Sequence, residues 1–259
     1  GAVKNDKILK LFEKIELFLY KNSEMVVAGT EAFKENLVSR GIMKDKITVV
    51  PNGATPEVFY PREKDKALLS FLNLNGKFIV GYIGTHGMAH GLELIAGWIG
   101  KISDEDIHFL FVGDGACKRK IIETAKGRNT RNLTILDSVS REQVPAYLSI
   151  MDDALVPLRK ADVFKTVLPS KIFEASAMGK PIILGVDGYA RELIERYGAV
   201  LCFEPENEMD FLKKLFLVKN DKVLHQRLKD GCRTLTSDFD RKRLAEQMYG
   251  YIKAAANGR

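Results

Sequence analysis

The sequence is poor in cysteine and has no long apolar run. Its three cysteines, Cys117, Cys202 and Cys232, lack the short spacing of a metal site, and an odd number cannot all pair. We therefore expect reduced thiols in a cytoplasmic protein rather than a disulfide scaffold. No apolar stretch approaches the roughly 20 residues that span a bilayer, and the first residues show no signal-peptide core.

No part of the chain holds a block of like charges. The formal net charge is +6, but lysines are interleaved with glutamates along the sequence. This pattern argues against a dedicated nucleic-acid binder, while the positive balance suits anionic partners such as nucleotides or phosphates. A hydrophobic fraction of 46% with 29% charged residues is ordinary for a globular protein and excludes the disordered and fibrous classes.

Short apolar runs alternate with helical patterns along the chain, which is typical of a parallel sheet covered on both faces. The larger series predicts strands at 77–84, 107–113, 133–139, 153–158, 181–186 and 199–204. Helices are expected near 91–100, 116–126, 141–150, 170–178 and 189–197, and two or three more within 207–256. The predicted fold is therefore α/β, with a doubly wound, Rossmann-like parallel sheet of about six strands.

A partial second α/β unit is expected at the N-terminus. Strands at 25–29 and 46–53 flank a helix at 31–41, and another helix at 5–21 precedes them. That first helix has an apolar face made by Ile8, Leu11, Phe12, Ile15, Phe18 and Leu19. The unit is too small to be a domain alone, and residues 51–63, rich in turn formers, are expected to link it to the larger series.

Ligands of an open parallel sheet bind beyond the carboxyl ends of its strands, so the loops there are the candidate sites. After the strand at 77–84, Gly84 and Gly87 let the backbone approach a ligand, and the helix that begins next offers free N–H groups to a phosphate. His86 and His90 in this loop favour phosphate contact. A glycine turn without a ligand explains the loop about as well, and no third ligand for a metal is nearby.

The next two loops carry weaker signals. Gly113 and Gly115 are interpreted as a tight turn, and the basic run 118–120 as a solvated face. Ser140 is expected to cap the following helix with its side chain. Val139 could offer an apolar edge to a nucleobase, although core packing explains it equally well.

The stretch VLPSKIFEASAMGKP, residues 167–181, combines an apolar helical face with Ser170, Lys171 and Glu174 near its start. Ser170 is predicted to be the N-cap. Glu174 lies in the first turn, where the helix dipole stabilises a carboxylate by about 0.3–1 kcal/mol. The same carboxylate could instead accept hydrogen bonds from two ribose hydroxyls while Lys171 and the helix N–H groups neutralise a diphosphate.

Several segments in this order resemble the retaining group 1 glycosyltransferases of GT-B fold: KITVVPNGATPEVFYP, GTHGMAHGLE, FLFVGDG, VLPSKIFEASAMGKPIIL and DGYARELIE. Within the family the chain resembles the branch with N-acetyl-L-fucosamine transferases of bacterial surface-polysaccharide assembly. The resemblance implies a nucleotide-sugar donor domain at 60–235, the last part of an acceptor domain at 1–55, and a helix at 236–259 that returns to the N-terminal segment. The chain would then be a truncated form or one part of a split enzyme.

The resemblance also implies the chemistry. A UDP-sugar would donate its sugar, with retention and without a metal ion or other cofactor, to a polysaccharide or lipid-linked glycan. No catalytic residue is assigned, and we expect the isolated chain to bind nucleotide but transfer sugar poorly. The implied donor-binding residues are Gly84, Thr85, His86, Gly87, His90, Val139, Ser170, Lys171 and Glu174.

Two departures from the family pattern stand out. The family has two glutamates eight positions apart; Glu174 matches the second, but Thr166 occupies the first, so sugar recognition must differ. Thr85 and His90 stand where many members carry an arginine and a lysine. Neutralising the diphosphate would then fall to backbone N–H groups with one of three cations: Lys171, Lys165 or Arg159.

The sequence is also compatible with other functions. The chain could be a non-catalytic, nucleotide-sugar-binding subunit of a split transferase, or a UDP-sugar 2-epimerase of GT-B shape. The apolar face of the helix at 5–21 could be core, a peripheral contact at the inner face of a membrane, or the interface of a homodimer.

Overall fold

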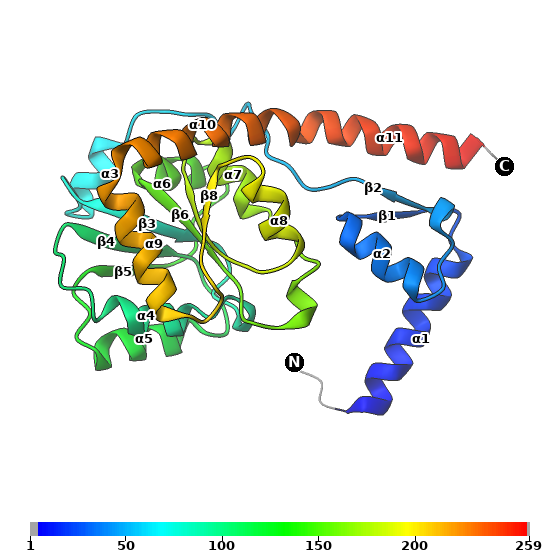
Figure 1. Cartoon of the computed structure of the whole chain (residues 1–259), viewed down its shortest axis with the longest axis horizontal. Helices are drawn as coiled ribbons and strands as arrows, with labels where there is room; N and C mark the ends of the chain where they lie inside the picture. Colours follow the sequence, from blue (N-terminus) through cyan, green and yellow to red (C-terminus); the bar gives the residue numbers. More distant parts are fainter. Residues whose placement is uncertain (1–4, 258–259) are drawn as a thin grey trace.

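The computed structural model describes residues 5–257, which form two parallel sheets of unequal size with flanking helices (Figure 1). The strands are β1 Val26–Ala28, β2 Ile47–Val49, β3 Phe78–Ile83, β4 Ile107–Val112, β5 Leu133–Leu136, β6 Asp153–Pro157, β7 Ile182–Gly185 and β8 Val200–Cys202. The α-helices are α1 Asp6–Asn22, α2 Glu31–Ser39, α3 Lys66–Phe71, α4 Leu92–Ile99, α5 Lys118–Gly127, α6 Val144–Ile150, α7 Lys171–Ala177, α8 Tyr189–Glu195, α9 Glu208–Asn220, α10 Lys222–Asp238 and α11 Arg241–Asn257.

The larger sheet confirms the doubly wound prediction. Its order is β5-β4-β3-β6-β7-β8, and every pair is parallel. The chain adds β4 and β5 on one side of β3, and then returns to add β6, β7 and β8 on the other side. Strand order therefore reverses between β3 and β6, and a crevice is expected at their carboxyl ends.

Side chains along the strands alternate between two cores, because successive residues of a strand point to opposite faces. On β4, Phe109 and Phe111 pack with residues of α4, α5 and α9, whereas Leu110 and Val112 pack with residues of α6, α7 and α8. Helix α10 contacts both α7 and α9. Both faces of the sheet are therefore covered, as the near-continuous apolar strands predicted.

Helix α6 starts three residues later than the sequence pattern predicted. Residues Ser140 to Gln143 form a turn instead, closed by a 3.0 Å bond from the Gln143 N–H to the Ser140 carbonyl. The Ser140 N–H donates to Oε1 of Gln143 at 3.1 Å, and no side chain caps α6. The prediction that the Ser140 side chain caps this helix is therefore wrong.

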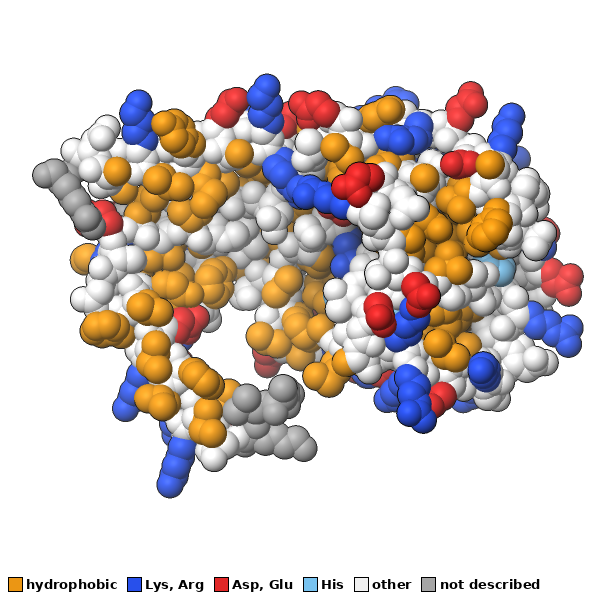
Figure 2. All heavy atoms as spheres, turned by 180° about the vertical axis from the view of Figure 1, so that it is seen from behind, with side chains coloured by type: hydrophobic (Ala, Val, Ile, Leu, Met, Phe, Trp, Pro, Cys, Tyr) orange, Lys and Arg blue, Asp and Glu red, His pale blue; other side chains and the backbone are white. Residues whose placement is uncertain are grey.

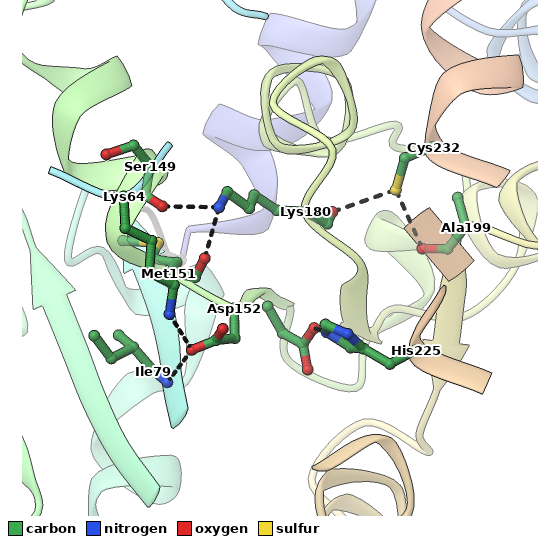
Figure 3. A network of polar contacts seen from close by, with 10 residues as sticks. Lys64, Ile79, Ser149, Met151, Asp152, Lys180, Ala199, His225 and Cys232 are labelled. Carbon is green, nitrogen blue, oxygen red and sulfur yellow. Dashed lines mark hydrogen bonds and ion pairs between the residues drawn. The ribbon is translucent and has the colours of Figure 1, made fainter. Parts of the chain in front are cut away.

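The amino ends of the central strands are held by a polar network (Figure 3). The Asp152 carboxylate accepts hydrogen bonds from the Ile79 N–H at 2.8 Å and from the Lys64 ammonium at 2.7 Å. The buried Lys180 ammonium donates to the carbonyls of Ser149 and Met151, each at 2.8 Å. This network lies at the opposite end of the strands from the crevice, so it positions the sheet and not a ligand.

The N-terminal unit has a small core of its own. Strands β1 and β2 pair in parallel, and the core residues are Val26, Ala28, Leu37, Ile42 and Ile47. Helix α1 buries no residue, and all six residues of its predicted apolar face are exposed. Apolar side chains gather along α1, the two-stranded unit and α11 (Figure 2). No helix within residues 5–257 is both long and apolar enough to cross a membrane.

The two units are joined where the linker meets the C-terminal helix. The Ala54 N–H donates to the Phe239 carbonyl at 3.1 Å, and the Arg241 N–H donates to the Ala54 carbonyl at 2.8 Å. The Arg241 guanidinium also donates to the Gly53 carbonyl at 2.6 Å. From this point α11 extends away from the larger sheet toward the N-terminal unit (Figure 1).

Candidate functional site

Backbone hydrogen bonds hold together the loops that follow β3, β4 and β6. The His86 N–H donates to the Asp114 carbonyl, and the His86 carbonyl accepts from the Cys117 N–H, both at 2.8 Å. The Arg159 N–H donates to the Ala89 carbonyl at 2.7 Å. The candidate site is therefore built on a preformed surface at the carboxyl ends of three adjacent strands.

Two glycines are needed for these loops to approach one another. Gly84 and Gly113 have φ angles of 137° and 153°, which L side chains rarely adopt. A Cβ at Gly113 would overlap the carbonyl oxygen of Gly84, and a Cβ at Gly84 would lie 2.6 Å from the Lys171 ammonium. Gly113 is thus required by contact between loops, whereas Gly84 leaves room for a cation.

Lys171, the first residue of α7, is the cation of the crevice. Its ammonium lies 5.3 Å from the centroid of the Tyr82 ring, close enough for a cation–π interaction. Within residues 5–257 it forms no ion pair. Burial lowers its pKa, and the nearby Glu174 carboxylate partly offsets this. A half-buried cation without an ion pair is costly, and an anionic ligand would offset that cost.

Glu174 lies one turn further along α7 and faces the same crevice. It lines a small cavity of about 20 Å³ together with Lys171, Ile83 at the end of β3 and Val156 of β6. Burial raises the pKa of its carboxyl, while Arg241, Arg141 and Lys171 lower it. The structure therefore brings the two residues singled out in the helical stretch together at the point where strand order reverses.

Tyr82, which no sequence motif singled out, organises the glycine loop. Its hydroxyl donates to the Thr85 carbonyl at 2.7 Å, and its ring centroid lies 5.9 Å from that of His86 and 5.5 Å from that of His90. Burial raises the pKa of this hydroxyl. The sequence offered one signal for Tyr82: it is an aromatic residue with a polar hydroxyl just before the end of a predicted strand.

The two histidines of the loop bring no positive charge to the site at neutral pH. His86 is fully buried, neither ring nitrogen has a hydrogen-bond partner in the described chain, and burial lowers its pKa to about 4. His90 places Nδ1 3.3 Å from the Pro157 carbonyl, and burial followed by the charge of Lys171 lowers its pKa. Any phosphate contact they make is therefore that of a neutral imidazole. Thr85, which precedes His86, is exposed, and Gly87 is half-buried.

Ser170 precedes α7 but does not cap it with its side chain, so that expectation is wrong. Its φ and ψ of −61° and −26° are helical, whereas a capping side chain needs an extended backbone to reach back to the N–H groups. The Ser170 side chain is exposed instead. Val139 is half-buried and packs against the core, which agrees with the packing interpretation.

Ion pairs occupy the other cations considered for a diphosphate. Arg159 contacts Glu93 closely and pairs with Glu206 at 3.0 Å. Lys165 pairs with Asp162 at 2.7 Å. Of the three cations named from the sequence, only Lys171 lacks a carboxylate partner in the described residues.

Lys118 was predicted to be part of a solvated face, and this is wrong. Its side chain is only 15% exposed. The ammonium donates to the carbonyls of Gly113 at 3.0 Å and Leu136 at 3.2 Å, and it contacts Asp137 closely. Lys118 therefore ties the ends of β4 and β5 together beside the site.

No group of three or more His, Cys, Asp or Glu side chains within residues 5–257 is arranged to hold a metal ion. The three cysteines are free and buried.

The chain matches a known family and several known proteins. The family described as "Glycosyl transferases group 1" matches residues 65–234, which contain all strands of the larger sheet. The chain is 27% identical over 213 residues to the putative colanic acid biosynthesis glycosyl transferase WcaI of Escherichia coli, covering 80% of this chain and 52% of that protein. It is 26% identical over 275 residues to the alpha-galactosylglucosyldiacylglycerol synthase of Streptococcus pneumoniae, covering 100% and 69%. The chain thus spans about half the length of the first relative.

Solved structures share the fold. Alr3699/HepE of Anabaena, in complex with UDP and glucose, superposes with a TM-score of 0.79 at 15% identity, covering 93% of this chain and 66% of that one. At this identity the similarity establishes the arrangement of strands and helices, and it leaves the roles of individual residues to the geometry above.

Proposed function

The chain belongs to the group 1 glycosyltransferases of GT-B fold, and from this we propose that the crevice between β3 and β6 binds the nucleotide part of a nucleotide-sugar, with UDP as the nucleotide. The observation that carries the proposal is that Lys171 and Glu174 lie one turn apart on α7 and both line the cavity at this crevice. The UDP complex of HepE, a protein of the same fold, supports the choice of nucleotide.

The two side chains suit different parts of the nucleotide. The Lys171 ammonium, held above Tyr82 and against Gly84, would neutralise the diphosphate. The Glu174 carboxylate would accept hydrogen bonds from the two neighbouring hydroxyls of the ribose, and such charge-assisted bonds are stronger than neutral ones. Val139, beside the end of β5, would contribute an apolar edge for the base.

We propose that the sugar is transferred with retention of its anomeric configuration and without a metal ion. As the bond between the anomeric carbon and the diphosphate oxygen breaks, negative charge grows on the diphosphate, and the preorganised Lys171 ammonium stabilises it. The anomeric carbon forms a bond to a hydroxyl oxygen of the acceptor, and the hydroxyl proton passes to the departing diphosphate. Because Lys171 is already desolvated, its interaction with the leaving group is stronger than it would be in water.

The acceptor that we propose is a polysaccharide or a lipid-linked glycan, met at the cytoplasmic face of a membrane. WcaI is named for colanic acid biosynthesis and the pneumococcal relative for a diacylglycerol glycolipid, and these two names support the proposal. Residues 60–235 would form the donor domain, residues 1–55 would be part of the acceptor domain, and residues 236–259 would connect back to it.

The exposed apolar face of α1 supports two further proposals about partners. Lysines on α1 and its exposed Phe12 and Phe18 suit peripheral contact with an anionic membrane, which co-sedimentation with vesicles containing phosphatidylglycerol would measure. The same face could join two copies of the chain. Light scattering at high concentration tests this, and a strict monomer would contradict the dimer.

The nucleotide proposal is tested by thermal unfolding with UDP, GDP and ADP. A ligand present at 100 times its dissociation constant adds about 2.7 kcal/mol to the free energy of unfolding. We expect UDP to raise the unfolding temperature and Glu174→Ala to remove most of the rise. The exposed Glu192→Ala on α8 is the matched control and should retain it. If Glu174→Ala kept the full rise, its carboxylate would serve only the helix, and the ribose role would be wrong.

A further inference from the structure

Strand β5 forms one edge of the larger sheet and pairs only with β4 (Figure 1). Phe109 of β4 lies opposite Leu133, and its N–H donates to the Asn132 carbonyl at 2.8 Å. Because alternate residues of a parallel strand bond to the same neighbour, the N–H and C=O groups of Leu133 and Ile135 point away from β4. In residues 5–257, no backbone group outside the sheet bonds to either residue.

This edge carries none of the usual protection against pairing with another strand. Natural sheets protect an edge with lysine, proline, a bulge or a very short strand. Strand β5 has the sequence LTIL, and its register with β4 is continuous. The strand at the opposite edge, β8, is three residues long, and its first and last residues are buried. Of the two edges, β5 is therefore the one suited to accept a further strand.

An apolar groove lies beside β5, between this strand and α5. Its volume is about 470 Å³, and its apolar lining consists of Ile122 and Ala125 with Leu133 and Ile135. The other lining residues are polar: Lys126, Asn129 and Thr130. All residues of β5 are half-buried. A strand added at this edge would satisfy the outward backbone groups and also remove apolar surface of the groove from water.

Charges of opposite sign flank β5. Arg131 lies two residues before the strand, and Asp137 follows directly after it. Both are exposed, the Asp137 side chain by 95%. Lys118 contacts only the Oδ1 atom of Asp137, so the other carboxylate oxygen is available within the described residues. Two copies of this strand would therefore repel at both ends when parallel and attract at both ends when antiparallel.

One antiparallel register satisfies both the backbone and the charges. A two-fold axis at Thr134 places Leu133 of each copy opposite Ile135 of the other. Both residues point outward, so each such pair exchanges two backbone hydrogen bonds. The same register places Arg131 of each copy opposite Asp137 of the other. A shift of two residues in either direction keeps backbone bonding but separates the arginine from the aspartate.

We propose that two copies of this chain associate through β5 in this register, as a symmetric dimer with one continuous sheet. The inference does not depend on the proposed nucleotide site, and its surface is distinct from the apolar face of α1. Antiparallel pairing places the carboxyl ends of the two sheets at opposite ends of the interface. Neither copy therefore covers the candidate site of the other.

Two charge reversals test the proposed register. Arg131→Asp brings like charges together at both ends of the interface, and so does Asp137→Arg. In an equal mixture of the two variants, a mixed dimer pairs opposite charges at both ends again. Arg227→Asp, an exposed reversal on α10, is the control. Sedimentation velocity from micromolar to near-millimolar concentration distinguishes the 29.1 kDa monomer from the dimer.

We expect the wild type and the Arg227→Asp control to dimerise equally as concentration rises. Each reversal alone should weaken dimerisation at least about tenfold, because like charges directly opposite one another destabilise paired strands. The mixture should dimerise far more strongly than either variant alone. Leu133→Pro removes an outward N–H at the first residue of an edge strand, where proline is tolerated, and it should also prevent dimerisation. Thermal unfolding of each variant checks that it folds.

Hydrogen exchange measures the strand pairing directly. The amides of Leu133 and Ile135 should exchange fast in dilute protein and become protected as the dimer forms. This protection should disappear in Arg131→Asp at the same concentration.

The other outcomes overturn the proposal. A wild type that stays monomeric at near-millimolar concentration has no such interface. If both reversals and Leu133→Pro leave a dimer intact, its interface lies elsewhere, as on α1. If the reversals dissociate the dimer and the mixture does not recover it, the proposed register is wrong. Amides of Leu133 and Ile135 that exchange at the same rate in dilute and concentrated protein would also exclude pairing through β5. UDP binding decides the proposed function separately in every case.

Discussion

The hydroxyl of Thr30 donates a 2.9 Å hydrogen bond to the carbonyl oxygen of Thr166, which lies 136 positions away in the sequence. The same hydroxyl oxygen accepts the Phe33 N–H at 3.0 Å and thereby caps α2. The Thr30 side chain is nearly buried, with 5% of its surface exposed. One oxygen therefore both begins a helix of the N-terminal unit and holds the loop that leads from β6 to Lys171.

We predict that Thr30→Val destabilises the protein by about 1–2 kcal/mol. Loss of an N-cap alone costs about 0.5–2 kcal/mol, and the Thr166 carbonyl also loses its donor. Thr30→Ser keeps the hydroxyl and should be much closer to the wild type. Urea unfolding of the three proteins measures the difference. Equal stability of the valine and serine variants would show that the bond contributes nothing.

Replacing Lys171 by methionine should weaken UDP binding about tenfold or more. A hydrogen bond to a charged group contributes about 1.5–3 kcal/mol, and no other cation named from the sequence is without a carboxylate partner in residues 5–257. Calorimetric titration with UDP measures the loss. Lys101→Met is the control, because Lys101 forms an exposed ion pair and is distant from Lys171 in the sequence. This variant should bind UDP as the wild type does. An unchanged affinity in Lys171→Met would place the diphosphate elsewhere.

Lys180 should matter for stability and not for ligand binding. Only 8% of its surface is exposed, and its ammonium satisfies the carbonyls of Ser149 and Met151 (Figure 3). Burial lowers its pKa to about 8, so the ammonium is still mostly charged at neutral pH. Since each buried carbonyl left without a donor costs about 1–3 kcal/mol, Lys180→Ala should lower the free energy of unfolding by several kcal/mol.

The exposed Arg227→Ala on α10 is the control for Lys180 and should change stability little. Chemical unfolding gives both values, and a UDP titration of Lys180→Ala should match the wild type once the variant is folded. A stability loss no greater than that of Arg227→Ala would mean that water replaces the ammonium.

Stability should fall as the pH drops from about 6.5 toward 4. Burial lowers the pKa of His86 and of His108 from 6.5 to about 4, so over this interval the unfolded chain binds protons that the folded chain does not. The raised pKa of the buried Asp153 opposes this loss of stability at the acid end of the range, because the folded state holds that proton more tightly than the unfolded state does.

Urea unfolding at several pH values tests this dependence. His108→Gln removes one of the two titrations and can keep a hydrogen bond to Thr134, so its stability should depend less steeply on pH than that of the wild type. Parallel curves for the two proteins would show that His108 does not titrate in this range.

Much of the fold could be predicted because its signals are local. Each apolar run with turn residues on both sides became a strand at or within a few residues of its predicted place, and Glu174 and Lys171 share a face because three residues make nearly one helical turn. The capping predictions failed at Ser140 and Ser170 for a reason the sequence does not display. Both depend on whether the backbone just before the helix is extended or already turned, which contacts with neighbouring loops decide.

The sequence alone determined the order of strands and helices, the edge of the sheet where the candidate site lies, and the family to which the chain is similar, because periodicity and motif spacing are properties of neighbouring residues. Only the tertiary structure decided which charges are free. Arg159, Lys165 and Lys171 look alike in the sequence, yet the first two have carboxylate partners and the third lies between Tyr82 and Gly84 with none in residues 5–257. The strength of a charge depends on its burial and on every charge around it, and distant segments supply several of those neighbours only after folding.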